Sequence, residues 1–83
     1  MVAPRHLTKT EIALQVLRER IGSGDLAAGK RLRVEELAGE LEMSPTPVRE
    51  ALRLLQADGL VDYRARKNRE SIDGIPAFEV SEL

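Results

Sequence analysis

The chain has 83 residues, of which 42% are hydrophobic and 33% are charged, and its formal net charge is -1 at pH 7. This length allows one small domain, and the absence of cysteine excludes a disulfide framework, a cysteine metal site and a thiol nucleophile. No apolar run approaches a membrane span and no secretory signal is visible, so we expect a cytoplasmic chain with no membrane partner.

The charge is unevenly distributed along the chain. Residues 44–69 hold six basic and three acidic residues, a net charge of +3, whereas residues 70–83 hold four acidic residues and no basic ones. A local excess of positive charge is what a surface facing nucleic acid requires, and here the acidic end of the chain conceals it in the total.

The first helix is predicted to begin near Thr8, after a flexible N-terminal arm over residues 1–7. Thr8 and Glu11 have the spacing of a capping box, in which each side chain satisfies a free amide of the first turn. We expect the helix to end at Gly22 or Gly24. Its apolar stripe consists of Ile12, Ala13, Val16, Leu17 and Ile21.

A loop and a short strand should follow this helix. Residues 24–29 read as a loop in which Leu26 turns inward. Residues 30–33 alternate and are too few for a helix, so they predict a small strand with Leu32 buried.

The stretch from Val34 to Gly59 predicts two helices joined by a tight turn. The first has one apolar stripe at helical spacing, and the second has an apolar stripe with a polar side opposite to it. The first stripe contains Leu37, Ala38 and Leu41; the second contains Val48, Ala51, Leu52 and Leu55, opposite Arg49, Glu50, Arg53 and Gln56. Helix, short turn and helix of this size form the helix-turn-helix that enters the major groove of DNA.

The turn between these helices contains Pro45 and Pro47, which cannot continue a helix because they lack N–H donors. Ser44 and Thr46 each precede a proline and both qualify as the N-cap of the second helix, and the sequence leaves both open. Gly59 supplies the positive-φ residue that commonly ends a helix.

After Gly59 the apolar period becomes alternating, which predicts two short strands around a turn at Lys67-Asn68. The first strand contains Leu60, Val61, Tyr63 and Ala65, and the second contains Ser71, Ile72 and Ile75. Such a hairpin makes the fold mainly α with a small β wing, a three-helix winged helix-turn-helix over residues 8–74. Residues 75–83 are expected to begin a linker, because a Gly-Ile-Pro break precedes them.

Four segments together resemble the N-terminal winged-helix domain of GntR-type bacterial transcription regulators, most closely the FadR-like branch. They are Ala-Gly-Lys-Arg-Leu (28–32), Glu-Leu-Ala-Gly-Glu-Leu (36–41), Ser-Pro-Thr-Pro-Val-Arg-Glu-Ala-Leu (44–52) and Asp-Gly-Leu-Val (58–61). The resemblance implies a homodimer on a pseudo-palindromic operator, with a C-terminal domain that binds a small-molecule effector. That domain is absent from this sequence, so we expect the present fragment to be weakly associated or monomeric.

Three positions depart from the family pattern. Pro45 stands where the family usually has an arginine that reads DNA. Glu42 stands at a turn position that is usually glycine, because left-handed backbone costs a residue with a Cβ about 1 kcal/mol. Asn68 stands in for the glycine of the wing.

The second helix of the motif supplies most of the candidate DNA-binding residues. Arg49, one turn into this helix, is predicted to grip a guanine edge, and the alternative for it is an ion pair with Glu50 or a neighbour. Arg53 lies a turn further on and should contact phosphate. The other candidates are Ser44, Pro45 and Thr46 at the helix start, Arg66, Lys67 and Arg69 at the wing, and Arg33 and Thr10 at the DNA backbone.

Two other classes of function compete with a DNA reader. An enzyme is disfavoured, because the one histidine, His6, lies in the arm and no carboxylate pair sits in a recognisable cleft. We expect no cofactor and no metal, although some GntR-type heads are fused to a pyridoxal-phosphate domain. The second competitor is a winged helix that binds another protein.

Overall fold

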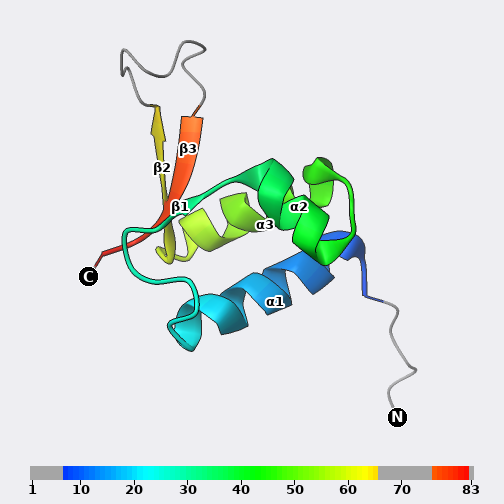
Figure 1. The fold of residues 1–83 in the computed structure, drawn as a ribbon, viewed down its shortest axis with the longest axis horizontal. Coiled ribbons are helices and arrows are strands. Elements are labelled where there is room, and N and C mark those ends of the chain that lie inside the picture. The colour runs from blue at the N-terminus through cyan, green and yellow to red at the C-terminus, as the bar shows by residue number, and fades with distance from the viewer. Residues whose placement is uncertain (1–6, 66–75, 83) are drawn as a thin grey trace.

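A computed structural model describes residues 7–65 and 76–82 (Figure 1). Three helices and three short strands follow one another as α1 (Lys9–Gly22), β1 (Arg31–Leu32), α2 (Val34–Leu41), α3 (Pro45–Ala57), β2 (Val61–Ala65) and β3 (Pro76–Val80). The strands form one antiparallel sheet in the order β1-β3-β2. The predicted fold class, a three-helix winged helix-turn-helix, is confirmed.

Helix α1 begins as the sequence predicted. The hydroxyl of Thr8 accepts from the backbone N–H of Glu11 at 3.1 Å, and the Glu11 carboxylate accepts from the backbone N–H of Thr8 at 2.9 Å. These two bonds satisfy free donors of the first turn. The buried face is narrower than the predicted stripe, because Ala13 and Leu17 are fully buried whereas Ile12 is 38% exposed.

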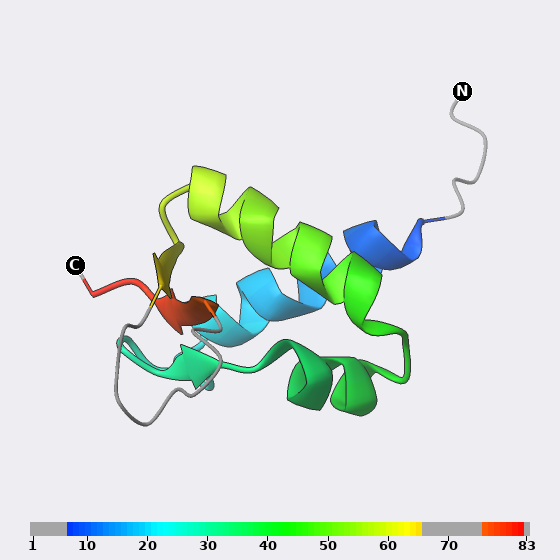
Figure 2. The same cartoon turned by 90° about the horizontal axis from the view of Figure 1, so that it is seen from above.

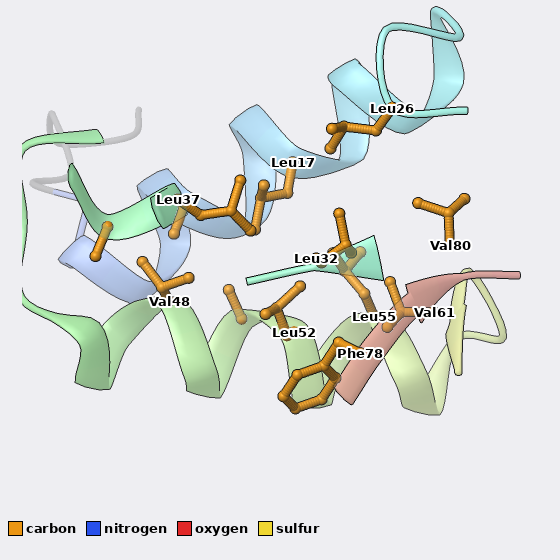
Figure 3. Close-up of a cluster of buried hydrophobic side chains, with 13 residues drawn as sticks. Leu17, Leu26, Leu32, Leu37, Val48, Leu52, Leu55, Val61, Phe78 and Val80 are labelled. Carbon is orange, nitrogen blue, oxygen red and sulfur yellow. The ribbon is translucent and has the colours of Figure 1, made fainter. Parts of the chain in front are cut away.

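The core is aliphatic and centres on α3, which packs against α1, α2 and β2. Figure 3 shows Val48, Leu52 and Leu55 of α3 directed toward Leu17 and Leu37 of the other two helices and toward the strands. Leu26 and Leu32 are buried, as the sequence predicted for the loop and for the short strand.

Strand β3 occupies the middle of the sheet, and this corrects the sequence prediction. The predicted linker over residues 75–83 is wrong for Pro76–Val80, which pair with both β1 and β2. Phe78 and Val80 point into the core, with Phe78 only 3% exposed. Strands β2 and β3 form a hairpin, with Ala65 opposite Pro76. The second strand predicted over residues 71–75 and the turn at 67–68 lie outside the described residues.

Helices α2 and α3 end in the same way, with one residue in left-handed backbone. Gly59 follows α3 with φ of 82°, as predicted, and Glu42 follows α2 with φ of 55°. In each case the next N–H reaches back five residues: Met43 donates to the carbonyl of Ala38 at 3.0 Å, and Leu60 donates to the carbonyl of Leu55 at 2.9 Å. Glu42 therefore adopts the conformation in which the family usually has glycine.

Arg20 connects three segments. Its guanidinium donates to Asp25 in the loop after α1 and to Glu40 of α2, each at 2.8 Å. Two hydrogen bonds raise the pKa of Arg20 above its ordinary value. The bond with Asp25 contributes most, and the bond with Glu40 contributes next. This contact holds the end of α1 against α2, beside the apolar core.

We predict that Phe78→Ala lowers the free energy of unfolding by about 3–4 kcal/mol, because it leaves a cavity at the contact between the sheet and α3. Urea denaturation followed by circular dichroism measures this. Leu54→Ala is the control, since Leu54 is 48% exposed and its loss should cost far less. Equal stability of the Phe78→Ala variant and the parent would contradict the placement of β3 in the core.

We also predict that Glu42→Gly raises the free energy of unfolding by about 1 kcal/mol, because glycine adopts left-handed backbone without the penalty of a Cβ. Thermal denaturation measures the gain. Glu42→Ala is the matched control: it removes the same charge from the end of α2 but keeps the Cβ. If both variants are stabilised equally, then charge and not backbone strain is the cause.

Candidate nucleic-acid interface

The start of α3 is defined by its backbone conformation, and no side chain caps it with a hydrogen bond. Ser44 is the N-cap, with extended backbone, and Pro45 occupies the first helical position, which decides between the two caps that the sequence left open. The Ser44 hydroxyl makes no capping hydrogen bond. Of the four positions from Ser44 to Pro47, only Ser44 and Thr46 carry an N–H, so the helix start offers few free amides.

Pro47 was not predicted to be a core residue, yet it is buried together with the apolar stripe of α3. Its ring packs at the end of α3 that faces the turn after α2. The proline thus fixes the direction in which the helix leaves the turn, because its φ is restricted and its side chain is held in the core. The sequence did contain a signal for this burial, because Pro47 precedes the buried Ala51 by one helical turn.

The side of α3 opposite the core carries four exposed polar residues at helical spacing. We call it the α3 polar face, and it consists of Thr46, Arg49, Arg53 and Gln56. Residues three and four apart lie one above the other on a helix, so these side chains form a single row. The row contains two cations and no carboxylate, and Figure 2 shows α3 lying along one side of the molecule.

The two acidic groups next to this row are engaged with α1. Glu50 accepts a hydrogen bond from the hydroxyl of Thr10 at 3.2 Å, and Asp58 pairs with Arg18 at 2.6 Å. Both contacts lie on the flank where α1 and α3 meet. Among the described residues Arg49 pairs with no carboxylate. The alternative that the sequence left open, an ion pair of Arg49 with Glu50, is not present, because the contact of Glu50 is with Thr10.

The other predicted site residues divide into three groups. Ser44 and Pro45 are exposed at the start of α3 and adjoin the α3 polar face. Thr10 lies beside α3 through its bond with Glu50, and Arg33 is exposed as the N-cap of α2. The wing cations Arg66, Lys67 and Arg69 lie outside the described residues.

An open hollow lies where the far end of α3 meets the wing, and sequence reasoning missed it. We call it the junction hollow; it is lined by Arg53, Gln56 and Tyr63. Tyr63 of β2 is 40% exposed, and its ring meets the ring of Phe78 edge to face, with the centroids 4.8 Å apart. No local pattern could have placed Tyr63 beside α3, because this contact depends on the strand register.

In the described ranges, 7–65 and 76–82, no group of three histidine, cysteine, aspartate or glutamate residues could hold a metal ion. No helix in these same ranges is long and apolar enough to cross a membrane.

The chain matches the family model described as bacterial regulatory proteins, gntR family, over residues 9–68. It is 47% identical over 57 residues to the uncharacterized HTH-type transcriptional regulator BphR of Paraburkholderia xenovorans (strain LB400), covering 69% of this chain and 23% of that protein. It is 43% identical over 63 residues to the probable D-xylose utilization operon transcriptional repressor of Paenarthrobacter nicotinovorans, covering 72% of this chain and 28% of that protein.

The fold is also similar to a solved one. A crystal structure assigned to a GntR-family transcriptional regulator superposes with a TM-score of 0.68 and 26% sequence identity, covering 90% of this chain and 26% of that one. The present chain therefore spans about a quarter of the length of each of these proteins.

Proposed function

This chain belongs to the gntR family of bacterial regulatory proteins, and from that premise we propose that α3 reads a specific operator sequence in the major groove of DNA. Family membership makes the chain a DNA-binding transcription regulator and not an enzyme. The observation that carries the proposal is the α3 polar face, an exposed row with two arginines on a helix whose other side is buried in the core.

Arg49 is the residue that we assign to base recognition. It lies one turn into α3 and is exposed, and no described carboxylate competes for its guanidinium. A guanidinium can donate to O6 and N7 of one guanine together, which is the commonest specific contact in the major groove. The Thr10–Glu50 bond supports this role, because it occupies the nearest carboxylate of α3.

The remaining contacts are assigned to the DNA backbone. The hydroxyls of Ser44 and Thr46 can donate to phosphate at the helix start, where Pro45 also contacts the DNA, and Arg53 adds charge further along. Arg66, Lys67 and Arg69 are proposed to approach the minor groove or its flanking phosphates from the wing. Arg33 and Thr10 are further candidates for backbone contacts.

We further place this chain at the head of a longer protein of the FadR-like branch, in the cytoplasm. Support comes from the coverage: the chain matches about a quarter of each related protein. In this proposal the C-terminal part binds a small-molecule effector and forms a homodimer. Two heads then meet a pseudo-palindromic operator, whereas the isolated head is monomeric or weakly associated.

Selection of bound sequences from a random duplex pool tests the function directly. A DNA reader enriches one half-site, and titration at two salt concentrations shows affinity that falls steeply as salt rises. Absence of duplex binding at low salt would instead favour a winged helix that binds another protein. The selected sequence supplies the operator for the measurements that follow.

We predict that Arg49→Ala loses discrimination between the selected operator and a mixed-sequence duplex, because about 1–3 kcal/mol of base recognition is removed. Arg49→Lys keeps the charge but cannot grip one guanine with two parallel donors, so it should retain affinity for the mixed-sequence duplex while losing specificity. Fluorescence anisotropy on both duplexes measures the ratio of the affinity for the operator to the affinity for the mixed-sequence duplex.

Arg31→Ala is the matched control for these variants, since Arg31 is exposed in β1 and lies outside α3. It should leave the ratio of the two affinities unchanged. Circular dichroism should show an intact fold for each variant. An Arg49→Ala variant that still prefers the selected operator as strongly as the parent would show that another residue reads the base.

A further inference from the structure

We propose that the junction hollow holds one backbone phosphate of the bound DNA, with Gln56 and Tyr63 donating hydrogen bonds to it beside the charge of Arg53. The proposal rests on the proposed function, because it requires DNA on the α3 polar face. It adds a binding site at the far end of α3, and it gives a role to two uncharged residues.

The chemistry of the lining fits an anion. The guanidinium of Arg53, the side-chain amide of Gln56 and the phenol of Tyr63 all carry N–H or O–H donors. Among the residues that the structure describes, no carboxylate lines the hollow, and Glu50 and Asp58 lie on the other flank of α3 with Thr10 and Arg18. Hydrogen bonds to a charged acceptor are stronger than neutral ones, so a hollow lined by three such side chains suits a phosphate.

The donors are held in place by the fold. Arg53 and Gln56 are three residues apart on α3 and lie on the same face. Tyr63 is fixed from the other side, because its ring stands edge to face against Phe78, which is buried in the core. Asp62 does not approach the site, since successive side chains of a strand point to opposite faces of the sheet.

The position of the hollow matches the path of a DNA strand. The first half of α3 is proposed to lie in the major groove, and the hairpin of β2 and β3 leads toward the neighbouring minor groove. The phosphate chain that separates these grooves must cross between α3 and the hairpin. The junction hollow lies at that crossing, because its lining residues come from the second half of α3 and from β2.

Two substitutions remove single donors from the hollow. Tyr63→Phe deletes only the phenolic hydroxyl and keeps the ring against Phe78, and Gln56→Ala deletes the amide on an exposed helix position. Each should weaken binding by about fivefold, equally for the selected operator and for a mixed-sequence duplex, because a phosphate carries no sequence information. Gln15→Ala, exposed on α1, is the control and should bind as the parent does.

A scan with single neutral methylphosphonate substitutions in the operator locates the contact. At one phosphate the parent should lose about fivefold or more in affinity, and Tyr63→Phe should lose clearly less than the parent there, because its contact with that phosphate is already gone while Arg53 and Gln56 keep theirs. At other positions the two proteins should lose affinity equally. The phosphate site is overturned if Tyr63→Phe and Gln56→Ala bind as the parent does. It is also overturned if the parent and Tyr63→Phe lose equal affinity at every phosphate position. Neither result would contradict the proposed function. Absence of any duplex binding by the parent overturns the proposed function and this site together.

Discussion

The burial of one side of α3 is the interaction on which the rest of the molecule depends. Val48, Ala51, Leu52 and Leu55 are fully buried, and the helix that carries them packs against α1, α2 and β2. In a core without cysteine and with few aromatic residues, this aliphatic stripe is the common contact of the other elements. Because that side must be buried, the opposite side with its two arginines must face outward.

The helices could be predicted from the sequence, whereas the middle strand of the sheet could not. The capping box at Thr8, the turn prolines and Gly59 are local signals, whereas the left-handed backbone at Glu42 was expected only from the resemblance to the family. Strand β3 has only two alternating core positions after its proline, Phe78 and Val80, too few for a periodic pattern. Its burial follows from its place between β2 and β1, and β1 lies far from it in sequence.

The same division applies to the candidate interface. Thr46, Arg49 and Arg53 share a face because of helical spacing alone, so the sequence could place them together. The engagement of Glu50 with Thr10 and the approach of Tyr63 to α3 depend on tertiary packing, across 40 residues in the first case. The sequence therefore predicted that the cations of the candidate interface share one face of α3, but it did not predict the tertiary contacts of Glu50 and Tyr63.

In the proposed complex, the prolines of α3 shift the source of DNA affinity from backbone amides to side chains. A helix start usually attracts phosphate with several unpaired N–H groups, but here Pro45 and Pro47 remove two of the four. The Ser44 hydroxyl makes no capping hydrogen bond, and its O–H can donate to a phosphate. The anionic backbone must then be held mainly by hydroxyls, amides and guanidinium groups spread along α3. The phosphate contact that we propose for Arg53, Gln56 and Tyr63 would give such a helix a second anchoring point at its far end.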